Sequence, residues 1–141
     1  MNNTTQTNTT TMKTAQKAFK HFSHGLETGE WQPYLDMLTD DFTLWFPLGK
    51  FRGKNVGKDS ASAFFKYLSE ELEVAVTISS IINVCSNENT VVFEFVDEGT
   101  SLGKPYQNRM TASLDVRGDK ICGHREYVGD IDPKAISMLE S

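Results

Sequence analysis

The chain has 141 residues, a formal net charge of −5 and a pI near 5.1. This length suits one domain with its own core, and the acidic balance argues against a nucleic-acid or anionic-membrane partner. No apolar run is long enough to span a membrane. The two cysteines, Cys85 and Cys122, are too far apart in sequence for a metal-binding or redox motif.

Residues 1–11 are nearly all Asn, Thr and Gln. Such low hydrophobicity is typical of disorder, and the segment lacks the basic start and apolar stretch of a secretory signal. We therefore expect a disordered polar arm over residues 1–11, a single domain over residues 12–130 and a tail over residues 131–141. The apolar residues of the tail are expected to cover a neighbouring surface, and the protein is expected in the cytoplasm.

Three helices are expected in the first half of the chain. The first spans about Met12 to Thr28, because apolar residues recur on one stripe at helical spacing, and Gly29 ends it. A short second helix covers residues 31–38 and a third covers about 55–72. A strand at residues 42–46 separates them. The stripe of the first helix consists of Ala15, Ala18, Phe19, Phe22 and Leu26.

The second half of the chain is predicted to form an antiparallel meander of four strands. These strands cover residues 74–85, 90–98, 106–116 and 120–128. Residues 99–105 are expected to form a loop, and Gly118 with Asp119 a tight turn. Helices followed by an antiparallel sheet indicate the α+β class.

The last strand does not have the pattern of an ordinary core strand. One face carries Cys122, His124, Glu126 and Val128. The other face carries Ile121, Gly123, Arg125 and Tyr127. Side chains alternate between the faces of a strand, but here the alternation alone does not decide which face is buried. Titratable groups on a core strand indicate a functional site.

Several short motifs occur in a specific order between residues 12 and 130. They are Leu38-Thr39-Asp40-Asp41-Phe42, Phe51-Arg52-Gly53-Lys54 with Ala63-Phe64-Phe65, Gly103-x-x-Tyr106-x-Asn108, Gly118-Asp119-Lys120-Ile121 and Arg125-Glu126-Tyr127-x-x-Asp130. In this order and spacing the chain resembles the nuclear transport factor 2-like superfamily, in particular its SnoaL-like and ketosteroid-isomerase-related branch.

The resemblance implies a cone-shaped, curved antiparallel sheet packed on three N-terminal helices around an apolar pocket. It also implies a homodimer formed through the outer sheet face. The superfamily contains isomerases, polyketide cyclases, epoxide hydrolases, dehydratases and non-catalytic binders, so membership does not determine activity. Its related enzymes carry an inward acid five residues after the isoleucine of the last turn. In this chain that acid is Glu126, which places Cys122, His124 and Val128 inward with it.

Glu126 is the first candidate for catalysis. In an apolar pocket its pKa is expected to rise toward neutrality, as a general acid or base requires; alternatively, it forms a structural ion pair with Arg109 or Arg125. His124 either shares a proton with Glu126 or is an ordinary buried histidine. Asn108 either binds a ligand carbonyl or holds Glu126 in place.

Six further residues are expected to bind the substrate. They are Tyr34, Phe46, Asp97, Tyr106, Met110 and Val128. The two tyrosines supply a phenol donor at the pocket rim, or they are core aromatics whose hydroxyl groups reach solvent. Asp97 is expected at the end of its strand, near the pocket mouth. Alternatively, it is an ordinary turn residue without a role in binding.

Two catalytic patterns of the superfamily are broken in this chain. In the ketosteroid isomerase pattern the base falls at Phe46, the tyrosine donor at Phe22 and the second acid at about Ala112, so that mechanism is not expected. In the epoxide hydrolase pattern Asp97 matches one acid, but the partner arginine falls at Phe95.

The sequence therefore predicts a small isomerase, cyclase or hydrolase that uses Glu126 as its acid or base. The substrate is expected to be a small apolar metabolite with a carbonyl or epoxide, and no cofactor or metal is needed for such chemistry. The alternative is a non-catalytic ligand-binding or protein-interaction module of the same fold.

Overall fold

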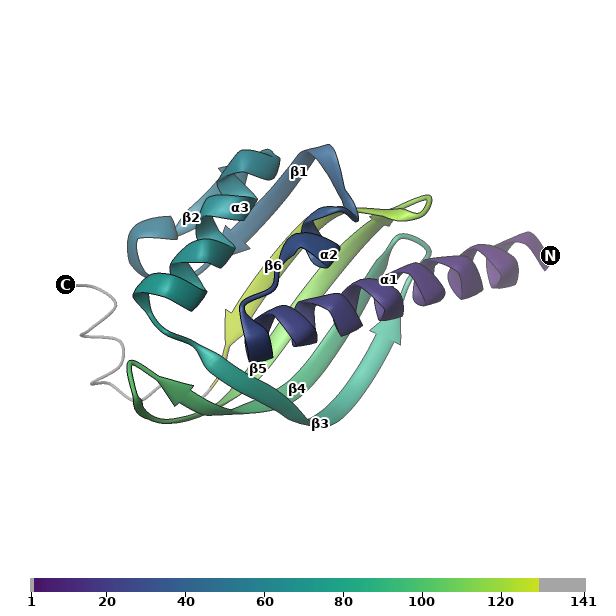
Figure 1. The fold of residues 1–141 in the computed structure, drawn as a ribbon. Coiled ribbons are helices and arrows are strands. Elements are labelled where there is room, and N and C mark those ends of the chain that lie inside the picture. Colours follow the sequence, from purple (N-terminus) through teal and green to yellow (C-terminus); the bar gives the residue numbers. More distant parts are fainter. Residues whose placement is uncertain (1, 130–141) are drawn as a thin grey trace.

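The computed structural model describes residues 2–129, with the backbone alone for residues 2–8. The tail expected over residues 131–141 lies outside the described residues. Figure 1 shows an α+β arrangement in which helices cover one face of a curved sheet. The helices are α1 (Asn2–Thr28), α2 (Gln32–Leu35) and α3 (Lys58–Lys66).

The sheet has six strands in the order β2-β1-β6-β5-β4-β3. Their bounds are β1 Leu38–Phe46, β2 Gly53–Val56, β3 Ala75–Ser86, β4 Thr90–Ser101, β5 Lys104–Arg117 and β6 Lys120–Val128. Neighbouring strands are antiparallel except β1 and β6, which are parallel. A parallel pair needs a long connection, and here the connection contains α3 and the four other strands of the sheet. The last strand is therefore inserted beside the first.

Helix α1 begins at Asn2 rather than at Met12, so the disordered arm expected over residues 1–11 is wrong from residue 2 onward. Thr11 is buried, and its hydroxyl donates a hydrogen bond of 2.8 Å to the carbonyl oxygen of Glu88. Such a contact stabilises a helix of low intrinsic propensity. Extending an existing helix is also easier than starting one.

The apolar stripe of α1 packs against the concave face of the sheet. Phe19 stacks on Phe93 of β4 with ring centroids 4.1 Å apart, and meets Phe95 edge-on at 5.2 Å. All five stripe residues are buried, which confirms the expected inward face. The expected end of the helix is also confirmed, because Gly29 follows Thr28 with a φ of +81°.

The region between β1 and β3 differs from the prediction. Residues 53–56 form the edge strand β2, which pairs with β1, instead of a turn and the start of a helix. The expected helix over residues 55–72 is therefore shorter. It consists of α3 and a π-helical turn at Tyr67–Glu71, where the Leu72 amide donates to the Tyr67 carbonyl.

The loop expected over residues 99–105 is wrong. Strands β4 and β5 continue until only Leu102 and Gly103 separate them, with φ values of +53° and +75°. Such values at both central residues are typical of a tight hairpin turn. No separate loop is left to close over a pocket.

Strand β3 is irregular because its register against β4 shifts twice, between Ile78 and Ser80 and between Ile81 and Asn83. A β-bulge changes which face the following residues occupy. Ile82, which follows the first shift, is 49% exposed, whereas Val76, which precedes both shifts, is buried.

Gly99 makes a close approach to β3, because an added Cβ would collide with the Ala75 carbonyl oxygen and the Val76 backbone. We predict that Gly99→Ala lowers the free energy of unfolding by roughly 1–3 kcal/mol in urea. Thr100→Ala, an exposed neighbour, should stay within about 0.5 kcal/mol of the wild type. Unchanged stability of the glycine variant would contradict this packing.

Candidate functional site

A chain of buried polar groups connects α2 to β6. The Tyr34 hydroxyl lies 2.5 Å from Nδ1 of His124, and Nε2 of the same ring lies 3.0 Å from Oε1 of Glu126. Tyr34 and His124 have no exposed surface, and Glu126 is 4% exposed. Tyr34 was expected at a pocket rim. Instead, it lies at the inner end of this row of buried polar groups.

The backbone of β6 explains which side chains point inward. The pairing of β5 with β6 shifts between Asp115 and Val116, so the strand does not alternate regularly from its first residue. The inward placement of His124 and Glu126 is confirmed, and Ile121 is also buried. Cys122 was expected to point inward with them, but it is only half-buried.

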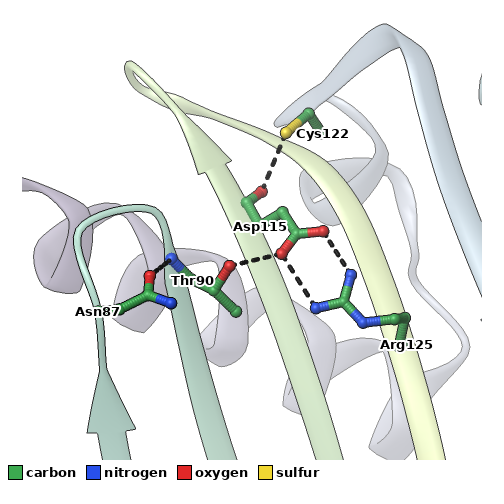
Figure 2. A network of polar contacts seen from close by, with 5 residues as sticks. All are labelled: Asn87, Thr90, Asp115, Cys122 and Arg125. Carbon is green, nitrogen blue, oxygen red and sulfur yellow. Dashed lines mark hydrogen bonds and ion pairs between the residues drawn. The ribbon is translucent and has the colours of Figure 1, made fainter.

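Figure 2 shows Cys122 in a second polar network, centred on Asp115. Its Sγ donates to the Asp115 carbonyl oxygen at 3.6 Å. Arg125 contacts both carboxylate oxygens, at 2.5 and 3.1 Å, and Thr90 donates to one of them at 2.7 Å. Burial alone would raise the pKa of Asp115, but hydrogen bonds from Arg125 and Thr90 lower it.

The contacts of Asp115 exclude one of the alternatives for Glu126, an ion pair with an arginine. Arg125 binds Asp115 and not Glu126, while Arg109 lies exposed. Among the described residues, the ion-pair partner of Glu126 is His124. The ion pair with an arginine, which the sequence left open, is therefore not formed.

Asp97 is a second buried acid in the interior. It is 5% exposed and pairs in register with Asn108 of β5. It lies well inside β4, which contradicts the expected place at the end of a strand. Burial, and then the charge of Glu126, raise its pKa to about 7. Its Oδ1 atom has no hydrogen-bond partner among the described residues, which is unusual for a buried oxygen.

Asn108 and Tyr106 lie beside this acid on β5. The Asn108 amide donates to the Tyr106 hydroxyl at 3.2 Å, and Asn108 is 4% exposed. Burial, and then the charge of Asp97, raise the pKa of Tyr106. Tyr106 is half-buried. Its place at a pocket rim and the binding of a ligand oxygen by Asn108 both stay predictions.

Apolar side chains complete the surroundings. Phe46 is buried against Phe64 with ring centroids 4.8 Å apart. Met110 is buried and faces half-buried Val128 across the β5–β6 pair. Phe65, which was not expected in the site, lies edge-on to the His124 ring at 6.0 Å.

Two surface hollows lie away from the buried acids. One of about 400 Å³ lies between α1, α2 and the β5–β6 turn. The other, of about 230 Å³, includes Met110 and Val128 together with Ile82 and Tyr127. Neither hollow is lined by Glu126, His124 or Asp97, so a pocket at these groups stays a prediction.

Two further findings concern the described residues alone. They contain no group of three or more His, Cys, Asp and Glu side chains placed to hold a metal ion. None of their helices combines the length and the apolar character that crossing a membrane requires.

Comparison with known proteins places the chain in a family. The model of the SnoaL-like domain matches residues 19–124. The chain belongs to the SnoaL-like domain family. No protein of curated function matches this SnoaL-like domain.

Solved structures agree with this assignment. An NTF2-like protein from Anabaena variabilis is 59% identical to this SnoaL-like chain, with a TM-score of 0.84 over 86% of this chain and 91% of that one. A candidate SnoaL-like polyketide cyclase from Jannaschia is 17% identical, with a TM-score of 0.71 over 94% and 92%. A candidate isomerase from Bacillus subtilis is also 17% identical, with a TM-score of 0.70 over 92% and 94%. The last two likenesses concern the fold alone.

The raised pKa of Asp97 predicts a specific pH dependence of stability. The folded state binds a proton that the unfolded state releases between pH 3.8 and about 7. The stability from protonated Asp97 is therefore complete below pH 3.8 and is lost as the pH rises through 7. Relative to wild type, Asp97→Asn should gain roughly 2–4 kcal/mol on going from pH 4 to pH 8.

Urea unfolding of both proteins at the two pH values measures this difference. Asp119→Asn removes an exposed charge and serves as the control. If Asp97→Asn and Asp119→Asn show the same pH dependence, Asp97 is not the group that binds this proton.

Proposed function

We propose that this SnoaL-like protein is a cofactor-free isomerase, cyclase or hydrolase. It moves a proton on a small apolar metabolite that carries a carbonyl or an epoxide. The observation that carries the proposal is the buried pair of Glu126 and His124, 3.0 Å apart. A carboxylate held by an imidazole, among apolar groups, has the setting of a general base.

The roles of the polar groups follow from their contacts. Oε1 of Glu126 faces His124, which leaves Oε2 to take or return a substrate proton. Asp97, with a pKa of about 7, is partly protonated at neutral pH and can donate a hydrogen bond to a substrate oxygen. Asn108 and Tyr106 lie beside it as further polar contacts for that oxygen.

The apolar part of the substrate is proposed to contact Phe46, Met110 and Val128. Phe46 and Met110 are buried and Val128 is half-buried, so these three side chains offer apolar surface next to the polar groups. The names of the structural neighbours, a candidate cyclase and a candidate isomerase, belong to those proteins, and both fit the proposed classes of reaction.

A chromogenic probe tests the base directly. In 5-nitrobenzisoxazole a base takes the proton from the ring carbon, and the C–H electron pair completes a nitrile. The N–O bond breaks, and its electron pair stays on the oxygen of the product, a phenolate. We predict turnover by the wild type and a loss of about 100-fold or more in kcat for Glu126→Gln. Circular dichroism shows whether this variant is folded.

Glu98→Gln, an exposed change on β4, serves as the control and should keep the wild-type rate. A folded Glu126→Gln variant with full activity would refute the role of Glu126. Loss of folding in that variant would instead show that the carboxylate holds the scaffold together.

A second candidate is a non-catalytic binding module. The observation in its favour is that neither surface hollow is lined by the buried acids. For this candidate the probe binds, seen as quenching of tryptophan fluorescence, but is not converted by the wild type.

We further propose a homodimer formed through the outer face of the sheet. Trp45 of β1 and Tyr127 of β6 lie 5.4 Å apart between ring centroids, and Tyr127 is 45% exposed. Exposed Ile82 borders the same hollow as Tyr127. Grouped aromatic and aliphatic side chains on an outer face support a protein contact.

The free thiol of exposed Cys85 supports the cytoplasm as the place of action.

Sedimentation velocity tests the dimer. We predict that Tyr127→Glu shifts the protein to monomer, because it places a charge inside the proposed contact. Ala63→Glu, an equal change at an exposed position of α3, should leave the dimer intact. Dimers in both variants would exclude this face, and a monomeric wild type would exclude the dimer.

A further inference from the structure

We propose that Tyr34 is a positioning residue whose phenol fixes His124 in the tautomer that donates a hydrogen bond to Glu126. The tautomer follows from contacts within the protein alone. Its effect on proton transfer rests on the proposed function.

The argument begins with the two nitrogens of the His124 ring. Nδ1 faces the Tyr34 hydroxyl at 2.5 Å, and Nε2 faces Oε1 of Glu126 at 3.0 Å. A neutral imidazole has one N–H donor and one acceptor nitrogen. If Nδ1 carried the proton, the lone pair of Nε2 would point at a carboxylate oxygen. The Tyr34 hydroxyl proton would also lose its acceptor in a site without water-exposed surface.

The opposite tautomer satisfies every group. The Tyr34 hydroxyl donates to Nδ1, and the N–H at Nε2 donates to Oε1 of Glu126. Burial, and then the charge of Glu126, raise the pKa of Tyr34, so the phenol keeps the proton that it donates. Each donor then meets one acceptor, which is the usual state of buried polar groups.

Aromatic packing keeps the imidazole in this orientation. The His124 ring meets Phe22 at 5.1 Å and Phe65 at 6.0 Å between centroids, and Tyr34 meets Phe65 edge-on at 5.5 Å. A half-turn of the imidazole would place ring carbons against both oxygens. Tyr34 therefore acts through His124, since its phenol reaches Glu126 by no contact of its own.

The consequence concerns the proposed base. With Nδ1 occupied, His124 can only donate to Glu126. Oε1 is then engaged and Oε2 is the atom left for a substrate. Without the Tyr34 hydroxyl, both tautomers become accessible and the Nε2 lone pair faces Oε1 in one of them.

The ¹⁵N chemical shifts of the His124 ring report the tautomer directly. The chain has three histidines, so His21→Gln and His24→Gln together leave one imidazole signal. At pH 7 we predict the Nε2–H tautomer in this background, and a mixture of both tautomers after Tyr34→Phe. Tyr67→Phe, at a half-buried tyrosine of the π-helical turn, should leave the shifts unchanged.

The same variants are assayed with 5-nitrobenzisoxazole. Tyr34→Phe should lower kcat about tenfold with little change in KM, because the phenol orients the base without touching the probe. Tyr67→Phe should match the wild type in both constants.

The outcomes separate this inference from the proposed function. An Nδ1–H tautomer or a doubly protonated ring in the unmodified site at pH 7 overturns the inference, even if Tyr34→Phe does not fold. Shifts and rates of Tyr34→Phe equal to those of the control overturn it as well. A tautomer change in Tyr34→Phe, together with no turnover by the wild type, supports the positioning of His124 by Tyr34 and refutes the proposed reaction.

Discussion

A carboxylate removed from water is stable only when its neighbours hydrogen-bond to it, and Glu126 is buried. Much of the arrangement around it follows from this constraint. The imidazole of His124 supplies the hydrogen bond, and it needs a second partner because its other nitrogen is equally buried. Tyr34 supplies that partner from α2, so the short helix and the last strand depend on each other. The rings of Phe22 and Phe65 pack against both His124 and Tyr34.

Regular periodicity made part of this fold predictable. The helical stripe of α1 leads to the observed buried face. The face of β6 could not be read from alternation, because the register shift near Asp115 breaks it, and only the resemblance indicated that Glu126 points inward. The contact between Tyr34 and His124 joins residues 90 positions apart, and no local pattern specifies it. Propensity likewise could not show that tertiary contacts continue α1 through a polar segment.

Asp97 shows why a site can conflict with stability. Its uncharged form suits the apolar interior, yet near neutral pH part of the population carries a charge beside Glu126. An apolar residue would avoid this conflict, and the unpaired Oδ1 adds to it. Local violations of this kind are expected at functional sites rather than in ordinary cores.

The parallel pairing of β1 with β6 has a consequence for synthesis on the ribosome. Strand β6 inserts between β1 and β5, so a nascent chain from which residues 120–128 have not yet emerged leaves both of these strand edges unpaired. The sheet can close only after residues 120–128 emerge, and such long-range pairing is slow to form. His124 and Glu126, two of the three groups of the buried polar chain, lie on this strand. Formation of the buried interior therefore waits for β6, and chaperones that shield unpaired edges would act before this strand emerges.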